Sequence, residues 1–341
     1  MTAPARTSSE GAAATEPGRG TIAQRVRARL IAVLAWLASA LPEGLAIRLA
    51  ELGGRLWYRA TPERAALARR QLQRVCRELA ARGEGSTRVR AAATTDRALE
   101  GLVRSAYRHA ARYYLEVMRT PRIDMRYIRE RVLIETPEVV DEAFDSDRPV
   151  IFVAAHFGAI ELPALYLVQR TGRRVVGPME TVGDPALQSW FVRSRGRVGL
   201  RIVGLREARR ELLASLRRGE SVGLVGDRDL TGGGLEVSLF GHPARLPLGP
   251  ALLAIQSGAP IYVAAVRRAG PGRYRARVQP IEVPTQGTRR ERAVLTVGRM
   301  ATAFETAVAE APDQWWAVFF PIWEDLATDP GTPASPAGQV A

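Results

Sequence analysis

The chain has 341 residues, of which 46% are hydrophobic, and this is enough for one large α/β domain with a helical segment attached to it. Arginine supplies all the strong cations, and the net charge of +14 indicates an acidic partner such as nucleic acid, an anionic membrane surface or a phosphorylated substrate. The single cysteine, Cys76, excludes an intramolecular disulfide and a cysteine zinc cluster, while an aromatic content of 6% without a nucleic-acid motif counts against a nucleic-acid binder.

The two ends of the chain differ in composition from the rest. Residues 1–20 are rich in Ala, Thr, Ser, Gly and Pro and contain neither an apolar run nor a cleavable signal pattern, so we expect a disordered leader there. We also expect a disordered tail at the Pro-rich residues 327–341.

Residues 21–125 form a predicted N-terminal helical region. At its start, several arginines precede an apolar run at residues 30–41, which is far shorter than the roughly 20 residues that a membrane-spanning helix needs. The pattern predicts either a membrane-associating helix, with its apolar side in the acyl layer and its arginines at anionic head groups, or a core helix at the domain edge. Residues 45–58 predict a second helix, and residues 62–119 are helical with a break at 83–86.

Residues 126–326 alternate between apolar β-branched runs and helical patterns, which predicts a βαβ series. Such a series forms a mainly parallel sheet with helices on both faces. The later strand patterns have shorter links between them, so the sheet is expected to become mixed. The predicted fold class is therefore α/β, a mixed and mainly parallel sheet flanked by helices, with the N-terminal helical region attached.

His156, one of three histidines, follows a strand pattern at residues 150–153 and precedes a helical pattern. Ligands in open α/β sheets bind at the carboxyl ends of the strands, where His156 is expected to lie. Glu161 is predicted to lie about one helical turn into the following helix, where its carboxylate can face the imidazole.

Charged residues also follow a second apolar strand, which ends in Asp227, Arg228 and Asp229. These side chains are expected at the same edge of the sheet as His156. Three consecutive glycines at 232–234 then form a loop that permits close approach, and Glu236 opens the next strand.

Motifs in a fixed order carry a family resemblance. They are His156-Phe157-Gly158 with Glu161, Asp227-Arg228-Asp229, Glu236-Val237, Phe240-Gly241, Leu248-Gly249-Pro250-Ala251, Ala259-Pro260 and Trp315-Trp316. Over residues 22–326 the chain resembles the lipid A late acyltransferase family, and within it the actinobacterial phosphatidylinositol mannoside acyltransferases. The resemblance implies a glycerol-3-phosphate-acyltransferase-like fold, association with the cytoplasmic face of the cell membrane, and acyl transfer from a thioester to a hydroxyl.

Acyl transfer to an alcohol needs a base that removes the hydroxyl proton, and His156 suits this role because the pKa of histidine lies near neutral pH. A carboxylate has to orient the imidazole, as in a serine triad whose nucleophile is supplied by the substrate. Glu161, in the His-x4-Glu motif, and Glu236 are both candidates. We favour Glu236, because a first-turn residue such as Glu161 often faces the helix N-terminus or solvent instead.

The remaining site residues are assigned to substrate binding. Arg228 and Arg195 are expected to bind phosphate groups of the donor or acceptor, with Arg193 and Arg197 as open alternatives to Arg195. Further substrate contacts are assigned to Asp227, Phe157 and Gly158.

The expected donor is acyl-CoA, or alternatively an acyl carrier protein, and the expected acceptor is a phosphatidylinositol mannoside or another glycolipid. A lipid A precursor and a lysophospholipid are the alternative acceptors. We expect a monomer that needs no metal or cofactor and does not bind nucleic acid.

Two other classes of function compete with this interpretation. A metal hydrolase would use His156, Glu161 and Asp227, but neither His109 nor His242 has the spacing of a second ligand. A non-catalytic lipid-binding protein or scaffold would explain the positive charge and the amphipathic N-terminus, and would leave His156 as a core residue.

Overall fold

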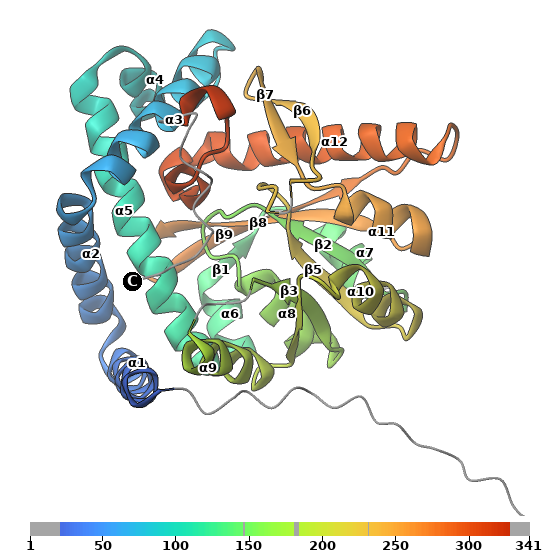
Figure 1. Cartoon of the computed structure of the whole chain (residues 1–341), viewed down its shortest axis with the longest axis horizontal. Helices are drawn as coiled ribbons and strands as arrows, with labels where there is room; N and C mark the ends of the chain where they lie inside the picture. Colours follow the sequence, from blue (N-terminus) through green and yellow to red (C-terminus); the bar gives the residue numbers. More distant parts are fainter. Residues whose placement is uncertain (1–20, 146, 181–183, 231, 328–341) are drawn as a thin grey trace, which may run out of the picture.

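The computed structural model describes residues 21–145, 147–180, 184–230 and 232–327. The predicted leader at 1–20 and residues 328–341 of the predicted tail lie outside this range. Two layers of helices enclose a central sheet, and five N-terminal helices stand beside it (Figure 1).

The central sheet has seven strands in the order β1-β9-β8-β2-β5-β3-β4. They are β1 (Val132–Ile134), β2 (Ile151–Ala154), β3 (Val175–Met179), β4 (Leu200–Gly204), β5 (Ser221–Val225), β8 (Ile261–Gly270) and β9 (Arg273–Ile281). Strand β9 runs antiparallel to β8, and all other neighbours in this sheet are parallel. The predicted mixed, mainly parallel α/β sheet is thus confirmed, except that β6 (Leu235–Leu239) and β7 (His242–Leu246) form a separate two-stranded antiparallel sheet.

The helices begin and end close to the sequence signals for them. They are α1 (Ile22–Ala40), α2 (Glu43–Ala60), α3 (Pro62–Ala81), α4 (Thr87–Thr94), α5 (Asp96–Arg119), α6 (Met125–Arg131), α7 (Pro137–Asp145), α8 (Leu162–Thr171), α9 (Pro185–Gly196), α10 (Ala208–Arg217), α11 (Gly249–Ser257) and α12 (Arg289–Glu310). Thr21 forms a capping box with Gln24 at the start of α1, and Pro62 occupies the first turn of α3.

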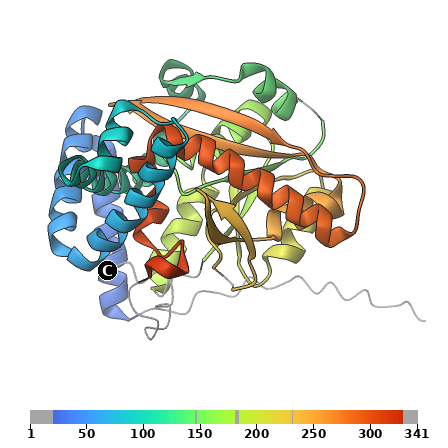
Figure 2. The same ribbon diagram turned by 90° about the horizontal axis from the view of Figure 1, so that it is seen from above.

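Successive side chains of a strand point to opposite faces of the sheet, so they pack into two core layers, one on each face. Ile151 and Val153 of β2 pack in one cluster with residues of α12 such as Met300, whereas Phe152 packs in another with residues of α7 and α8 such as Phe144. The helix α12 crosses one face of the sheet, as the view from above shows (Figure 2).

The N-terminal helices share a core with the rest of the protein. Leu72 of α3 and Tyr107 of α5 are fully buried and belong to the same apolar cluster as Phe304 of α12 and Phe319. The side chain of Gln71 reinforces this contact, because its amide donates to the carbonyl oxygens of Val318 and Phe320. Among the described residues, no helix combines the length and the hydropathy that crossing a membrane would require.

Candidate active site

His156 lies two residues beyond the end of β2, at the carboxyl edge of the parallel strands. Strand β5 is a parallel neighbour of β2, and Ala154 is paired with Val225. Continuing this register by two residues brings His156 beside Asp227. The imidazole Nδ1 is 2.6 Å from Asp227 Oδ1, and the backbone N–H of His156 donates to Asp227 Oδ2 at 2.8 Å.

The carboxylate of Asp227 is fully enclosed by its partners. The indole N–H of buried Trp315 donates to Oδ2 at 2.7 Å. Burial by itself raises the pKa of Asp227, but the charge and hydrogen bonds of His156 and the hydrogen bond from Trp315 outweigh it, so the pKa lies below its ordinary value. Asp227 is therefore ionised at neutral pH and accepts a hydrogen bond from the N–H at Nδ1 of His156, which leaves the lone pair of the imidazole on Nε2, where it can act as a base.

The loop that follows His156 is tightly fixed. Gly158 has a φ of 56°, and a Cβ at this position would lie 1.9 Å from the carbonyl oxygen of Val266. Phe157 forms a β-bridge with Trp315, and the carbonyl of His156 accepts a hydrogen bond from the Trp316 N–H at 2.9 Å.

These contacts correct the roles expected for Phe157 and Gly158. The side chain of Phe157 is buried in the core, and Gly158 is needed where the backbone passes close to β8. Both residues therefore hold His156 in position, and neither presents a side chain to a substrate.

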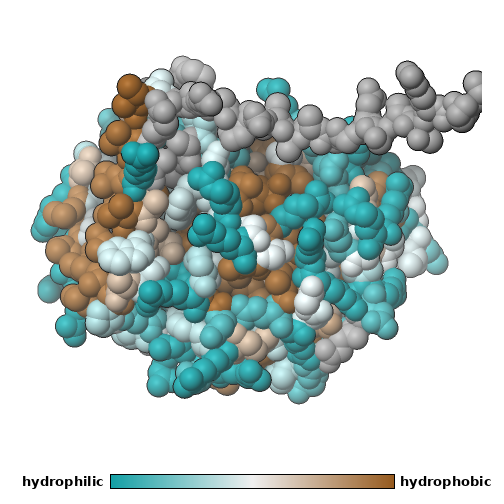
Figure 3. All heavy atoms as spheres, turned by 90° about the horizontal axis from the view of Figure 1, so that it is seen from below, coloured by the Kyte–Doolittle hydropathy of each residue, from teal (hydrophilic) through white to brown (hydrophobic). Residues whose placement is uncertain are grey.

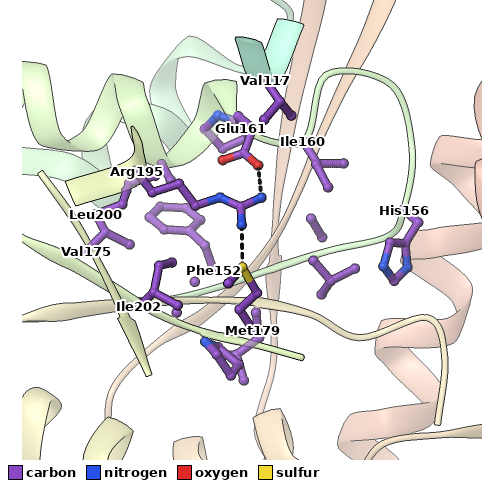
Figure 4. Close-up of a pocket in the computed structure, with 18 of the residues that line it drawn as sticks. Val117, Phe152, His156, Ile160, Glu161, Val175, Met179, Arg195, Leu200 and Ile202 are labelled. Carbon is purple, nitrogen blue, oxygen red and sulfur yellow. Dashed lines mark hydrogen bonds and ion pairs between the residues drawn. The ribbon is translucent and has the colours of Figure 1, made fainter. Parts of the chain in front are cut away.

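A cavity of about 340 Å³ opens beside His156. Its walls are mostly apolar and come from β2, β3, β4, β5, α5, α8 and α9. His156 lies at one end, and Val175 and Leu200 lie at the opposite end, near the start of β3 and β4 (Figure 4). The ring of Trp316 packs against that of His156, with 4.4 Å between the two centroids. The arrangement suits a long apolar group whose polar end stops at the imidazole.

Glu161 and Arg195 form an ion pair in the wall of this cavity. The guanidinium of Arg195 donates to Glu161 Oε1 at 2.6 Å and lies 2.8 Å from the sulfur of Met179 (Figure 4). Burial lowers the pKa of Arg195, but Glu161 and Tyr113 outweigh that effect and raise it, so the guanidinium stays charged.

The structure thus contradicts the position expected for Glu161 and the role expected for Arg195. Helix α8 begins only at Leu162, so Glu161 precedes it instead of lying one turn inside. Its carboxylate neutralises Arg195 and does not contact His156, because the two side chains are held together across the start of α8 and the end of α9. Arg195 therefore already has an anionic partner, which does not fit the expected phosphate contact.

The prediction that Glu236 orients His156 is also wrong. Strand β6 leaves the central sheet and pairs only with β7, where Glu236 is exposed opposite Arg245. In the described part of the chain, no hydrogen bond or ion pair joins Glu236 to His156. The glycine loop bends toward Asp229 instead, which accepts hydrogen bonds from the N–H groups of Gly232 and Gly234 at 3.1 and 2.6 Å.

Arg228 follows Asp227 and is stacked on an aromatic ring, with its guanidinium carbon 3.8 Å from the centroid of Phe320. Burial lowers the pKa of Arg228, while the charges of Asp227 and Glu180 oppose this effect. Within the described residues, its guanidinium has no hydrogen bond or ion pair with a protein group. Phe320 in turn contacts Trp316, whose ring centroid lies 4.4 Å from that of His156, so two aromatic rings connect Arg228 to the imidazole.

Among the described residues, no three His, Cys, Asp or Glu side chains lie close enough together to hold a metal ion. His109 belongs to α5, where its Nε2 lies 3.8 Å from Oδ2 of Asp313, while His242 is on β7.

The residues at this site form a base oriented by a carboxylate, beside an apolar cavity. The sequence placed His156 and Asp227 at one sheet edge, but the substrate contact assigned to Asp227 is wrong, because its buried carboxylate is occupied by His156 and Trp315. No role was assigned to Trp315. The strand order β2-β5 is the missing information, because a βαβ pattern does not state which strands are neighbours.

Comparison with known proteins identifies the family of the chain. Residues 21–323 match the family model described as bacterial lipid A biosynthesis acyltransferase. The chain is 28% identical over 224 residues to a phosphatidylinositol mannoside acyltransferase of Mycolicibacterium smegmatis, covering 63% of this chain and 70% of that protein. It is 32% identical over 154 residues to a protein of the same name from Mycobacterium tuberculosis H37Rv, covering 43% of this chain and 48% of that protein, about half its length.

Proposed function

Because the chain belongs to the bacterial lipid A biosynthesis acyltransferase family and is an enzyme that transfers acyl groups, we propose that it moves a long fatty acyl chain from an acyl thioester to a hydroxyl of a glycolipid. The favoured donor is acyl-CoA, and the favoured acceptor is a phosphatidylinositol mannoside, after the names of the two relatives. The observation that carries the proposal is the His156–Asp227 pair at one end of an apolar cavity.

In this mechanism Nε2 of His156 removes the proton of the acceptor hydroxyl as its oxygen attacks the thioester carbonyl. The tetrahedral intermediate collapses with cleavage of the C–S bond, and the imidazolium returns the proton to the leaving thiolate. Asp227 stabilises the imidazolium and keeps Nδ1 protonated throughout, and Trp315 holds Asp227 in place.

The cavity supports an apolar donor chain. A fatty acyl group that lies along the sheet from His156 toward Leu200 would replace water against apolar walls, with a gain of roughly 0.8 kcal/mol for each buried methylene. The thioester then lies beside the imidazole. The guanidinium of Arg228 suits a phosphate of the donor or the acceptor, because no protein anion among the described residues forms an ion pair with it.

The test of this function is an assay with labelled palmitoyl-CoA or palmitoyl acyl carrier protein and a panel of acceptors, with products resolved by mass. We expect one acyl chain to be added to phosphatidylinositol mannoside. A product from a lipid A precursor or a lysophospholipid instead would change the acceptor class. A protein that binds these lipids and transfers nothing would contradict the proposal in favour of a lipid-binding role.

Membrane association is the second part of the proposal, and it rests on an exposed apolar surface. Apolar side chains gather at the end of the molecule that holds α1 and α2 (Figure 3). The large exposed ones on these two helices are Ile22, Val26, Leu30, Val33, Leu34, Trp36, Leu37, Leu45, Leu49, Leu52 and Leu56. We propose that this α1–α2 surface lies against the cytoplasmic face of the cell membrane, where the lipid acceptor is found.

Replacing Leu30, Leu49 and Leu56 by glutamine in one variant is expected to weaken binding to anionic vesicles by at least about tenfold, because each substitution removes apolar area from the membrane contact. Binding of the unaltered protein should also fall as salt rises, since exposed arginines such as Arg29 act through a screened surface potential. Sedimentation with vesicles measures both effects.

The matched control replaces Leu133 and Leu295, which are as exposed but lie on β1 and α12. This control should bind vesicles like the unaltered protein. Equal binding by the α1–α2 variant and the control would show that this surface is not the membrane contact.

A further inference from the structure

Gly223 lies within strand β5, on the face that lines the cavity. Glycine is a poor choice inside a strand, because it costs conformational entropy and offers no side chain to pack. Its backbone does not require glycine here, since its φ is outside the left-handed region. A Cβ at this position would meet only the Cγ1 atom of Val175, at the ordinary contact distance of 3.5 Å.

The neighbouring glycine of the cavity differs in this respect. A Cβ at Gly177 on β3 would lie 2.9 Å from the carbonyl oxygen of Gly223, so the close approach of two strands explains that glycine. Gly223 has no such explanation in the backbone. What its missing side chain provides is open space in the cavity.

The strand register gives the depth at which this space lies. Gly223 is paired with Phe152, four residues before His156 along β2. At about 3.3 Å per residue, this level is roughly 13 Å from the imidazole. An extended alkyl chain advances about 1.3 Å per carbon, since its bonds of about 1.5 Å zigzag, so its tenth carbon or so lies beside Gly223.

We propose that Gly223 is a specificity-determining residue that lets acyl chains longer than about ten carbons extend past Phe152 toward Val175 and Leu200. This inference rests on the proposed function. Any larger side chain at position 223 would project from the face of β5 into the cavity beside Val175 and shorten the cavity from its deep end, while the end beside His156 would keep its shape.

The test is the variant Gly223→Leu, assayed with acyl-CoA donors from eight to sixteen carbons. We expect kcat/KM for the sixteen-carbon donor to fall by at least about tenfold, while the value for the eight-carbon donor changes little. Gly223→Ala should change the ratio of the two values in the same direction by a smaller factor, and it serves as the test if the leucine variant does not fold. Gly101→Leu, at an exposed helical glycine, is the matched control.

A binding measurement separates this inference from the proposed reaction. The shift in melting temperature caused by palmitoyl-CoA should be reduced in Gly223→Leu, and the shift caused by octanoyl-CoA should be retained. Equal loss of both donors, or an unchanged preference, would overturn the role of Gly223 even if the unaltered protein transfers acyl chains. The expected change in binding without any acyl transfer by the unaltered protein would support this role and overturn the proposed function alone.

Discussion

Replacing His156 with alanine is expected to lower the rate of acyl transfer by roughly 100- to 10,000-fold, the usual contribution of a general base. The side chain is largely enclosed, with 14% of it exposed, and its ring contacts Asp227 and Trp316. The imidazole of His156 lines the cavity. The loop that carries His156 is held mainly by backbone contacts such as the hydrogen bond from the Trp316 N–H to the His156 carbonyl. The folded structure should therefore survive the change.

Initial rates of acyl transfer and thermal melting curves, measured on the same variant, test this prediction. His242→Ala, on the separate β6–β7 sheet, is the control and should keep full activity. A His156→Ala protein that keeps more than about a tenth of the rate would exclude the role of base. A protein that no longer folds would favour a core histidine instead.

Asp227→Asn is expected to lower turnover by about 10,000-fold, as the loss of the triad carboxylate does elsewhere. Asparagine fills the same space, but its amide stabilises the wrong tautomer of His156 and leaves the imidazolium without a charge partner. The low pKa of Asp227 keeps its carboxylate ionised throughout the neutral range in the unaltered protein, whereas the amide of asparagine does not ionise, so raising the pH should not restore the variant.

Two glutamate variants make this prediction specific. Glu236→Gln should retain nearly full activity, because Glu236 is exposed on β6. Glu161→Gln should chiefly lower the melting temperature, because it leaves the enclosed guanidinium of Arg195 without its anion, a loss of about 3 to 5 kcal/mol for a buried pair. If Glu236→Gln lost most of its turnover while Asp227→Asn kept it, Asp227 would not be the orienting carboxylate.

Much of the fold was predictable because its signals are local. The apolar β-branched run of β2 and the proline at the start of α3 identify their elements without reference to the rest of the chain. The order of strands is not local information. The hairpin of β6 and β7 has the alternation of any half-buried strand pair, and nothing in its residues states that it leaves the central sheet.

The same limit explains the site. His156 was identified from its place at a strand end, whereas its partner depends on β5 lying next to β2 in one register. Sequence proximity favoured Glu161, and a flexible glycine loop favoured Glu236. Asp227 was already at the correct edge of the sheet, but its contacts with His156 and Trp315 exist only after the chain has folded.

Direct transfer from donor to acceptor is the central claim, because His156 acts in this account as a base and does not carry the acyl chain. The masses of the intact protein and of the lipid, measured during a single turnover of acyl-CoA with and without phosphatidylinositol mannoside, test it most directly. We expect the acyl mass to appear on the glycolipid, to require His156, and never to appear on the protein. A protein that gains the mass of the acyl chain before the acceptor is added, and then passes it on, would contradict the account.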